Sequence, residues 1–147
     1  MKNSMTSLSF PDVNVWLALV SHEHVHSAIA RRWWNSSNGQ IAFCRLSQLG
    51  LLRLLTTAAV MKDKPLSFDA AWRIYDSLLA DDRVVFSPEH SQVDTFFRSN
   101  TTGPASAPKV WADAWLLAVA EAAGGVLVTF DKALAARGAH CLLAKRG

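Results

Sequence analysis

Residues 110–131 read "VWADAWLLAVAEAAGGVLVTFD", and they decide the fold class because they join a helix to a strand. The first part is rich in alanine and repeats apolar side chains at helical spacing, which predicts a helix over 110–123. Two glycines then stop the helix, and the short apolar run "VLVTF" at 126–130 predicts a buried strand. A helix that leads directly into a strand is the repeating unit of α/β domains.

The same alternation of short strands and helices runs outward through the rest of the chain. Further strands are predicted at 8–10, 40–44, 83–86 and 140–144, and helices at 14–19, 24–34, 46–55, 67–82, 88–98 and 132–137. Ser47 and Ser67 are predicted as N-caps, and Pro88 as part of a first helical turn. We therefore expect one α/β domain over residues 1–147, a three-layer α/β/α arrangement around a central, mostly parallel sheet of about five strands.

Composition narrows the class of protein without identifying a function. The chain has 147 residues, half of them hydrophobic, and a net charge of +3, which permits a polyanionic partner without requiring one. It contains no run long and apolar enough to span a bilayer, and its first ten residues lack the apolar region of a secretory signal. We therefore expect a cytoplasmic protein without a membrane partner. Cys44 and Cys141 are expected to be buried, reduced thiols.

Three aspartates are expected to meet at one edge of the sheet. Asp12 and Asp131 each directly follow a predicted strand, and ligands of open α/β sheets bind at the carboxyl ends of the strands. Asp113 lies near the start of the helix at 110–123, in line with Leu116 and Leu117 on its apolar stripe. Asp113 should therefore point inward at the same edge.

Each aspartate alone also has a simpler structural interpretation. Asp12 and Asp131 could cap the helices that follow them, and Asp113 could favour the positive end of its helix dipole. Together, carboxylates in a partly buried cleft repel one another, and a divalent cation removes that penalty. Hard oxygen ligands suit Mg²⁺, with Mn²⁺ as an alternative. The three aspartates in combination therefore favour a metal site.

Three segments resemble the signature segments of the PIN-domain ribonucleases: "PDVNVWLA" at 11–18, "WADAWLLAVA" at 111–120 and "VLVTFDKAL" at 126–134. The likeness is greatest to the VapC toxins of bacterial toxin–antitoxin pairs, and runs from Asp12 to the last predicted strand. "HVHSAIARRWW" at 24–34, followed by "LSQLGLLRLLT" at 46–56, resembles one VapC subgroup. The resemblance implies a PIN-like fold and a Mg²⁺-dependent endoribonuclease that hydrolyses RNA phosphodiester bonds through a metal-activated water.

By that resemblance, Asp12, Asp113 and Asp131 are the catalytic metal ligands, and Asn14 and Thr129 support them. It also implies a VapB-like antitoxin as partner, RNA as substrate and a homodimer.

The chain departs from the family pattern at one position. PIN domains usually carry a glutamate at the start of the helix after the second strand, where this chain has Gln48. An amide can accept a hydrogen bond from a metal-bound water but brings no charge, which leaves a second metal position open. Three basic residues, Arg53, Lys109 and Lys132, are weaker candidates for contacts to substrate phosphates.

Other interpretations of these residues remain open at this point. The chain could be a catalytically impaired PIN-like binding module whose acidic residues are structural. A phosphoacceptor receiver domain is a poorer match, because its first strand is usually followed by two acidic residues and here by Asp12 alone. His22, His24 and His26 in "SHEHVH" are expected to be surface or capping residues and not metal ligands.

The tryptophans divide into two groups. Trp16, Trp111 and Trp115 lie in apolar segments and are predicted to be core residues. Trp33 and Trp34 are adjacent, so one helix face cannot bury both. One of them is expected either to contact an antitoxin or a second copy of the chain, or to pack at the helix end.

Overall fold

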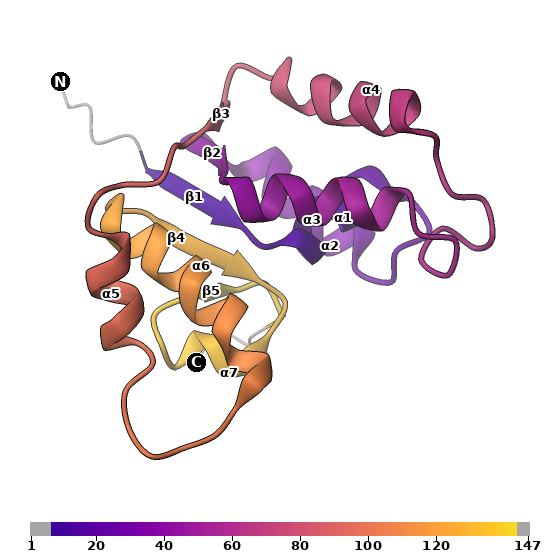
Figure 1. Ribbon diagram of the computed structural model, residues 1–147. Coiled ribbons are helices and arrows are strands. Elements are labelled where there is room, and N and C mark those ends of the chain that lie inside the picture. Colours follow the sequence, from indigo (N-terminus) through magenta and orange to yellow (C-terminus); the bar gives the residue numbers. More distant parts are fainter. Residues whose placement is uncertain (1–6, 144–147) are drawn as a thin grey trace, which may run out of the picture.

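The computed structural model describes residues 7–143 and contains one five-stranded sheet in the order β3-β2-β1-β4-β5 (Figure 1). Every neighbouring pair of strands is parallel, which confirms the predicted parallel sheet. The strands are β1 (Leu8–Pro11), β2 (Gln40–Phe43), β3 (Val84–Phe86), β4 (Val126–Thr129) and β5 (His140–Cys141).

Helices cover both faces of the sheet, as the alternating sequence pattern predicts. They are α1 (Val13–Val20), α2 (Ser27–Ser36), α3 (Arg45–Leu55), α4 (Phe68–Leu79), α5 (Val93–Ser99), the 3₁₀ helix η1 (Pro108–Val110), α6 (Trp111–Ala122) and α7 (Lys132–Ala135). The first four α-helices pack on one face, and α5, α6 and α7 pack on the other (Figure 1). This is the three-layer α/β/α arrangement.

The strands divide their side chains between the two layers with a period of two. On β2, Ile41 and Phe43 pack with α1–α4, whereas Ala42 packs with α5–α7. Trp16 of α1 is fully buried and stacks on Phe43, with ring centroids 3.8 Å apart. Gly50 of α3 lies against Val13, where an added Cβ would come within 2.5 Å of a valine methyl group. These contacts fix the start of α1 against the sheet.

Two helices begin later than the sequence pattern predicts, and a histidine precedes each. His24 Nδ1 accepts a hydrogen bond from the His26 N–H (3.0 Å), and α2 begins only at Ser27. His90 Nδ1 accepts from the Gln92 N–H (3.0 Å), so that α5 begins at Val93 and Pro88 lies outside it. Such local side-chain bonds compete with the first helical turn.

The predicted cap of α3 is also wrong by three positions. Ser47 is the third residue of the helix, and Cys44 occupies the N-cap position. The Ser47 hydroxyl accepts a hydrogen bond from the Cys44 N–H (3.0 Å) and thereby helps to cap the first turn of α3. Ser67, by contrast, is the N-cap of α4 as predicted, and its hydroxyl accepts from the Ala70 N–H (3.1 Å).

The tryptophans follow the prediction except at one position. Trp16 is buried, and Trp33 and Trp34 are both partly buried against the α1–α4 core. Trp115 is partly buried, but Trp111 is 56% exposed, so its assignment to the core is wrong. It stands at the first position of α6, where the chain emerges from an exposed loop.

The two cysteines and the helix lengths agree with the composition. Cys44 and Cys141 are both buried and form no disulfide. Over residues 7–143, no helix reaches the length and apolar character needed to cross a bilayer.

Candidate active site

The order in which the chain adds strands to the sheet reverses between β1 and β4. From β1 the chain adds β2 and β3 on one side, and then returns to place β4 and β5 on the other side of β1. Ligands of open parallel sheets bind at the carboxyl edge of such a switch point. Asp12 directly follows β1, and Asp131 lies two residues after the end of β4. The Asp12 N–H donates to the Val128 carbonyl (2.9 Å), which joins the ends of these two strands.

Asp12 is the N-cap of α1, and both of its carboxylate oxygens accept hydrogen bonds. Oδ1 accepts from the Val15 N–H (3.1 Å), and Oδ2 accepts from the Thr129 hydroxyl (2.5 Å). Burial raises the pKa of the Asp12 carboxyl above its ordinary value, and the negative charge of Asp113 adds to that rise. The hydrogen bonds from Thr129 and Val15 act in the opposite direction. The simple capping interpretation is therefore correct for Asp12, but it does not account for all its contacts.

Thr129 links two of the aspartates through its hydroxyl group. Its side chain is fully buried and donates to Asp12, while the same oxygen accepts from the Asp131 N–H (3.0 Å). Asp131 is exposed and caps α7, with Oδ1 accepting from the Ala133 N–H (2.9 Å). The hydroxyl of one residue thus orients the first carboxylate and the backbone that carries the second.

Asp113 comes to the same edge from the other side of the fold, in the first turn of α6. Its carboxylate has no hydrogen-bond partner among residues 7–143, which leaves both oxygens free for a ligand. Burial raises the pKa of Asp113, the charge of Asp131 adds to the rise, and the charge of Arg137 opposes it. Because Asp113 acts on Asp12 and Asp131 acts on Asp113, the three carboxylates form one electrostatic group.

The donor set fits a hard divalent cation that keeps part of its water shell. In the described part of the chain, no three His, Cys, Asp or Glu side chains already converge on a single metal position. Mg²⁺ is usually held through one or two carboxylates and several waters, so it does not require a closed protein cage. Two carboxyl groups with raised pKa values beside a third carboxylate are the environment that such a cation stabilises.

The other predicted supporting residues lie outside this hydrogen-bond network. The Asn14 side chain is exposed on α1, and only its backbone N–H acts on Asp12. Gln48 is buried, accepts a hydrogen bond from Arg45 and lies close enough to Tyr75 of α4 to oppose the rise that burial causes in the pKa of that phenol. Within the described residues, Gln48 makes no hydrogen bond to any of the three aspartates. Its side chain lies where α3 packs against α4.

The basic residues divide by location. Lys132 directly follows Asp131, and Lys109 lies in η1, four positions before Asp113; both are exposed. Arg53 instead lines a separate surface cavity between α3 and α4. Arg137, which the sequence analysis does not single out, acts on Asp113 and donates from Nη2 to the Asn100 carbonyl (2.8 Å). The only sequence signal for Arg137 is its place six residues after Asp131.

The histidines lie close to the site without belonging to it. His24 and His26 pack against Phe130, with ring centroids 5.9 and 4.7 Å from it. Burial lowers the pKa of His24, and the neighbouring His26 adds to this effect. His24 and His26 therefore have a packing role beside the end of β4, and His24 also accepts the hydrogen bond that precedes α2.

Comparisons with known proteins identify the family. A model of the PIN domain matches residues 9–139. The chain is 41% identical to Ribonuclease VapC41 of Mycobacterium tuberculosis over 128 residues, which cover 83% of this chain and 88% of that protein. It is 34% identical to Ribonuclease VapC39 of the same organism, over 84% of this chain and 88% of the relative.

A solved structure shares the fold at low sequence identity. The crystal structure of Mycobacterium tuberculosis VapC20, described as a Sarcin-Ricin loop cleaving toxin, superposes with a TM-score of 0.61 at 17% identity. The match covers 88% of this chain and 95% of that one. This likeness shows the shared fold, and the family model and the sequence relatives show that the chain belongs to the PIN-domain family, among the VapC ribonucleases.

Proposed function

We propose that this chain is the toxin of a VapBC-like toxin–antitoxin pair, a Mg²⁺-dependent endoribonuclease that acts in the cytoplasm as a single PIN domain over residues 1–147. Membership in the VapC ribonucleases supports the reaction class, and the named relatives are ribonucleases. The mildly positive charge of +3 agrees with an RNA substrate.

The observation that carries this proposal is the linked group of Asp12, Thr129, Asp131 and Asp113 at the switch point. Caps need only a backbone N–H to bond, and Asp12 and Asp131 both have one. Capping does not require a buried hydroxyl that connects two strands, nor a third carboxylate without a hydrogen-bond partner within residues 7–143. Together these features form a site where a bound cation would neutralise the repulsion between the three carboxylates.

Each side chain then has a distinct part in hydrolysis. A bound Mg²⁺ would polarise the scissile phosphate and lower the pKa of the attacking water. Asp12 is held by its two hydrogen bonds and would be one ligand of the cation. Asp131 would be a second ligand, and Asp113 would bind the cation and orient the attacking water. Lys109 and Lys132 flank the site and can contact phosphates of the RNA.

Protein partners follow from the same proposal. A VapB-like antitoxin would bind and silence the toxin, and a second copy of the chain would form a homodimer. Large apolar side chains on the α1–α4 side of the molecule support contacts of this kind, since Val25 is 85% exposed and Phe68 is 82% exposed.

The test is cleavage of RNA by the purified protein, with Asp113→Asn as the decisive variant. We expect cleavage with Mg²⁺ or Mn²⁺ and none with EDTA. Asp113→Asn should lower the rate on the order of 10³-fold, because it removes a charged ligand worth several kcal/mol in the transition state. The matched control is Asp69→Asn, which changes another aspartate in the first turn of another helix, α4, and should leave the rate unchanged.

The outcomes separate the proposal from its alternative. Circular dichroism should show that both variants fold. Equal cleavage by Asp113→Asn and the wild-type protein would exclude the metal site, and absence of cleavage by the wild-type protein would favour a catalytically impaired binding module.

A further inference from the structure

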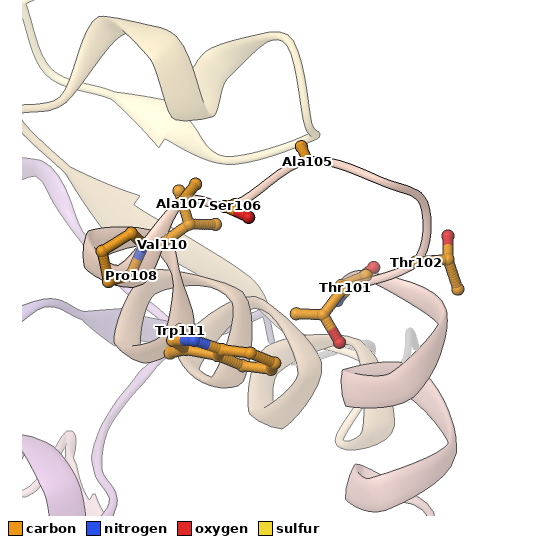
Figure 2. Close-up of a pocket in the computed structure, with 9 residues that line it drawn as sticks. Thr101, Thr102, Ala105, Ser106, Ala107, Pro108, Val110 and Trp111 are labelled. Atoms are coloured by element: carbon orange, nitrogen blue, oxygen red, sulfur yellow. The ribbon is translucent and has the colours of Figure 1, made fainter.

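A second cavity opens under the loop between α5 and α6, at the start of the helix that carries Asp113. Its volume is about 380 Å³, within the size range of small-ligand pockets, roughly 300–1,000 Å³. Figure 2 shows the ring of Trp111 below the loop, with Thr101 and Thr102 to one side and Pro108 to the other. The cavity therefore has an aromatic floor and a wall formed by small and polar side chains.

Trp111 is held in place while much of its surface stays open. The ring is 56% exposed and meets the edge of Phe97, with centroids 5.9 Å apart and planes at 71°. Exposing a tryptophan is costly for an isolated domain, because a large apolar surface stays in water. An aromatic side chain held by a neighbouring ring and open to a polar cavity is suited to stacking against a flat ligand.

The cavity flanks the aspartates and does not contain them. Trp111 and Asp113 are two positions apart on α6, so their side chains leave the helix about 200° apart at 3.6 residues per turn. Arg137 connects the two places: it follows the short helix α7 that Asp131 caps, and its Nη2 donates to the carbonyl of Asn100 (2.8 Å), where the loop begins. A chain of nucleotides with its scissile phosphate at Asp113 would pass the start of α6, where this cavity opens.

We propose that this cavity binds one unpaired nucleobase of the RNA substrate, stacked on Trp111, next to the scissile phosphate. This inference rests on the proposed ribonuclease function. Proteins that recognise single-stranded RNA stack unpaired bases on aromatic side chains and hydrogen-bond their edges.

The residues that line the cavity supply groups that can hydrogen-bond the edge of a base. Thr101, Thr102 and Ser106 bring hydroxyl groups that both donate and accept, and Asn100 brings an amide. The Asn100 amide is already engaged with Glu121 Oε1 (2.9 Å), and the Thr101 hydroxyl donates to the Phe97 carbonyl (2.8 Å), which leaves the hydroxyls of Thr102 and Ser106 for the base. Lys109, between the loop and α6, can contact the phosphate of the same nucleotide.

The experiment measures binding of a fluorescein-labelled single-stranded RNA by fluorescence polarisation, in EDTA so that the RNA is not cut. The RNA is one that the wild-type protein cleaves at a mapped site. A series of oligonucleotides replaces one nucleotide at a time, around that site, by an abasic one. Each is measured against the wild-type protein, Trp111→Ala, Trp111→Phe and Trp72→Ala.

Trp72 of α4 provides the matched control. It is 46% exposed, lines another cavity, of about 300 Å³, and meets Tyr75 edge-on at 5.7 Å, but it lies on the α1–α4 side of the sheet. Its replacement should leave RNA affinity unchanged.

One abasic position should weaken binding to the wild-type protein by about 5- to 150-fold, the range measured for base–aromatic stacking. Trp111→Ala should weaken binding of the intact RNA by a similar factor and make it insensitive to that abasic position, whereas Trp111→Phe should keep most of the affinity. The Trp111→Ala protein should retain its circular dichroism spectrum, because the side chain is half exposed.

Three results would overturn the proposal, and they differ in what else they reject. Unchanged affinity of Trp111→Ala for every RNA would reject the nucleobase site alone. Unchanged RNA binding with weaker binding to the antitoxin would assign the cavity to a protein ligand. Failure of the wild-type protein both to cut and to bind any RNA would reject the ribonuclease function and this site with it.

Discussion

The carboxyl edge of the sheet has two halves that are built alike and differ in chemistry. At the ends of β1 and β4 the chain continues through Asp12 and Asp131, whereas at the ends of β2 and β3 it continues through Cys44 and Ser87. In both halves, a local hydrogen bond caps the first turn of the helix that follows the strand. At β2, Ser47 bonds the backbone of Cys44 in the same turn, while at β1 the Asp12 side chain reaches Thr129 of another strand.

The comparison separates what a fold needs from what a site needs. At the β2 end, the cap of α3 is uncharged and hydrogen-bonds only its own helical turn. Such a cap stabilises a single helix. The cap at the β1 end is charged, partly buried and tied to a second strand, which costs stability unless a cation compensates. The half of the edge that carries this cost is the half at the switch point between β1 and β4.

Among the variants that compare the two halves of the edge, removal of the Thr129 hydroxyl should have the largest effect on RNA cleavage. Thr129→Val keeps the shape but leaves Asp12 Oδ2 and the Asp131 N–H without their shared partner. RNA cleavage and Mg²⁺ affinity should fall by about 10- to 100-fold, the usual effect of changing a group that orients metal ligands.

Thr129→Ser, which restores the hydroxyl, is the matched control for that variant. It should recover most of the activity under the same assay. An equally low rate for Thr129→Ser and Thr129→Val would mean that packing, and not the hydroxyl, positions the aspartates.

The corresponding change in the neutral half should affect stability alone. Ser47→Ala removes the acceptor for the buried Cys44 N–H and should lower the free energy of unfolding by about 1 kcal/mol. For a domain of this size that corresponds to a fall of about 2–4 °C in Tm, measured by calorimetry. The rate of RNA cleavage should stay at the wild-type value; a large loss of activity would show that the two halves are not independent.

The smallest effect is a gain of stability when a charge is removed from the acidic half. The pKa of Asp113 is raised in the folded protein, so its contribution is favourable at low pH and is lost as the pH rises above about 4 and through the raised value. Without metal at pH 7, Asp113→Asn should therefore be more stable than the wild-type protein, by a few tenths of a kcal/mol because the carboxyl is partly exposed.

Calorimetry in EDTA at pH 7 and pH 4 measures this difference. The expected gain in Tm is about 1–2 °C at pH 7, and it should shrink at pH 4. A gain that is the same at both pH values would show that repulsion among the aspartates is not its cause.

Much of this comparison could be predicted from the sequence, because it depends on local pattern. The order of helices and strands follows from periodicity, and the position of Asp12 and Asp131 follows from their place after apolar runs. The late starts of α2 and α5 could not be predicted, since they depend on whether a histidine ring turns back to the backbone.

The remaining differences come from tertiary contacts. Gln48 accepts a hydrogen bond from Arg45 and lies beside Tyr75 because α4 packs beside α3, and nothing in the segment 46–55 indicates that neighbour. Trp111 is exposed because the loop before α6 leaves an open cavity above its ring, although its flanking residues are as apolar as those of a buried helix. Arg137 reaches Asp113 only through the turn after α7.

The central claim is that Asp12, Asp113 and Asp131 share one divalent cation, and titration calorimetry with Mn²⁺ tests it most directly. The wild-type protein and Asp69→Asn should bind Mn²⁺ with the same saturable affinity, and Asp113→Asn should bind at least about 10-fold more weakly. Equal binding by all three proteins, or no binding by the wild-type protein, would contradict the claim.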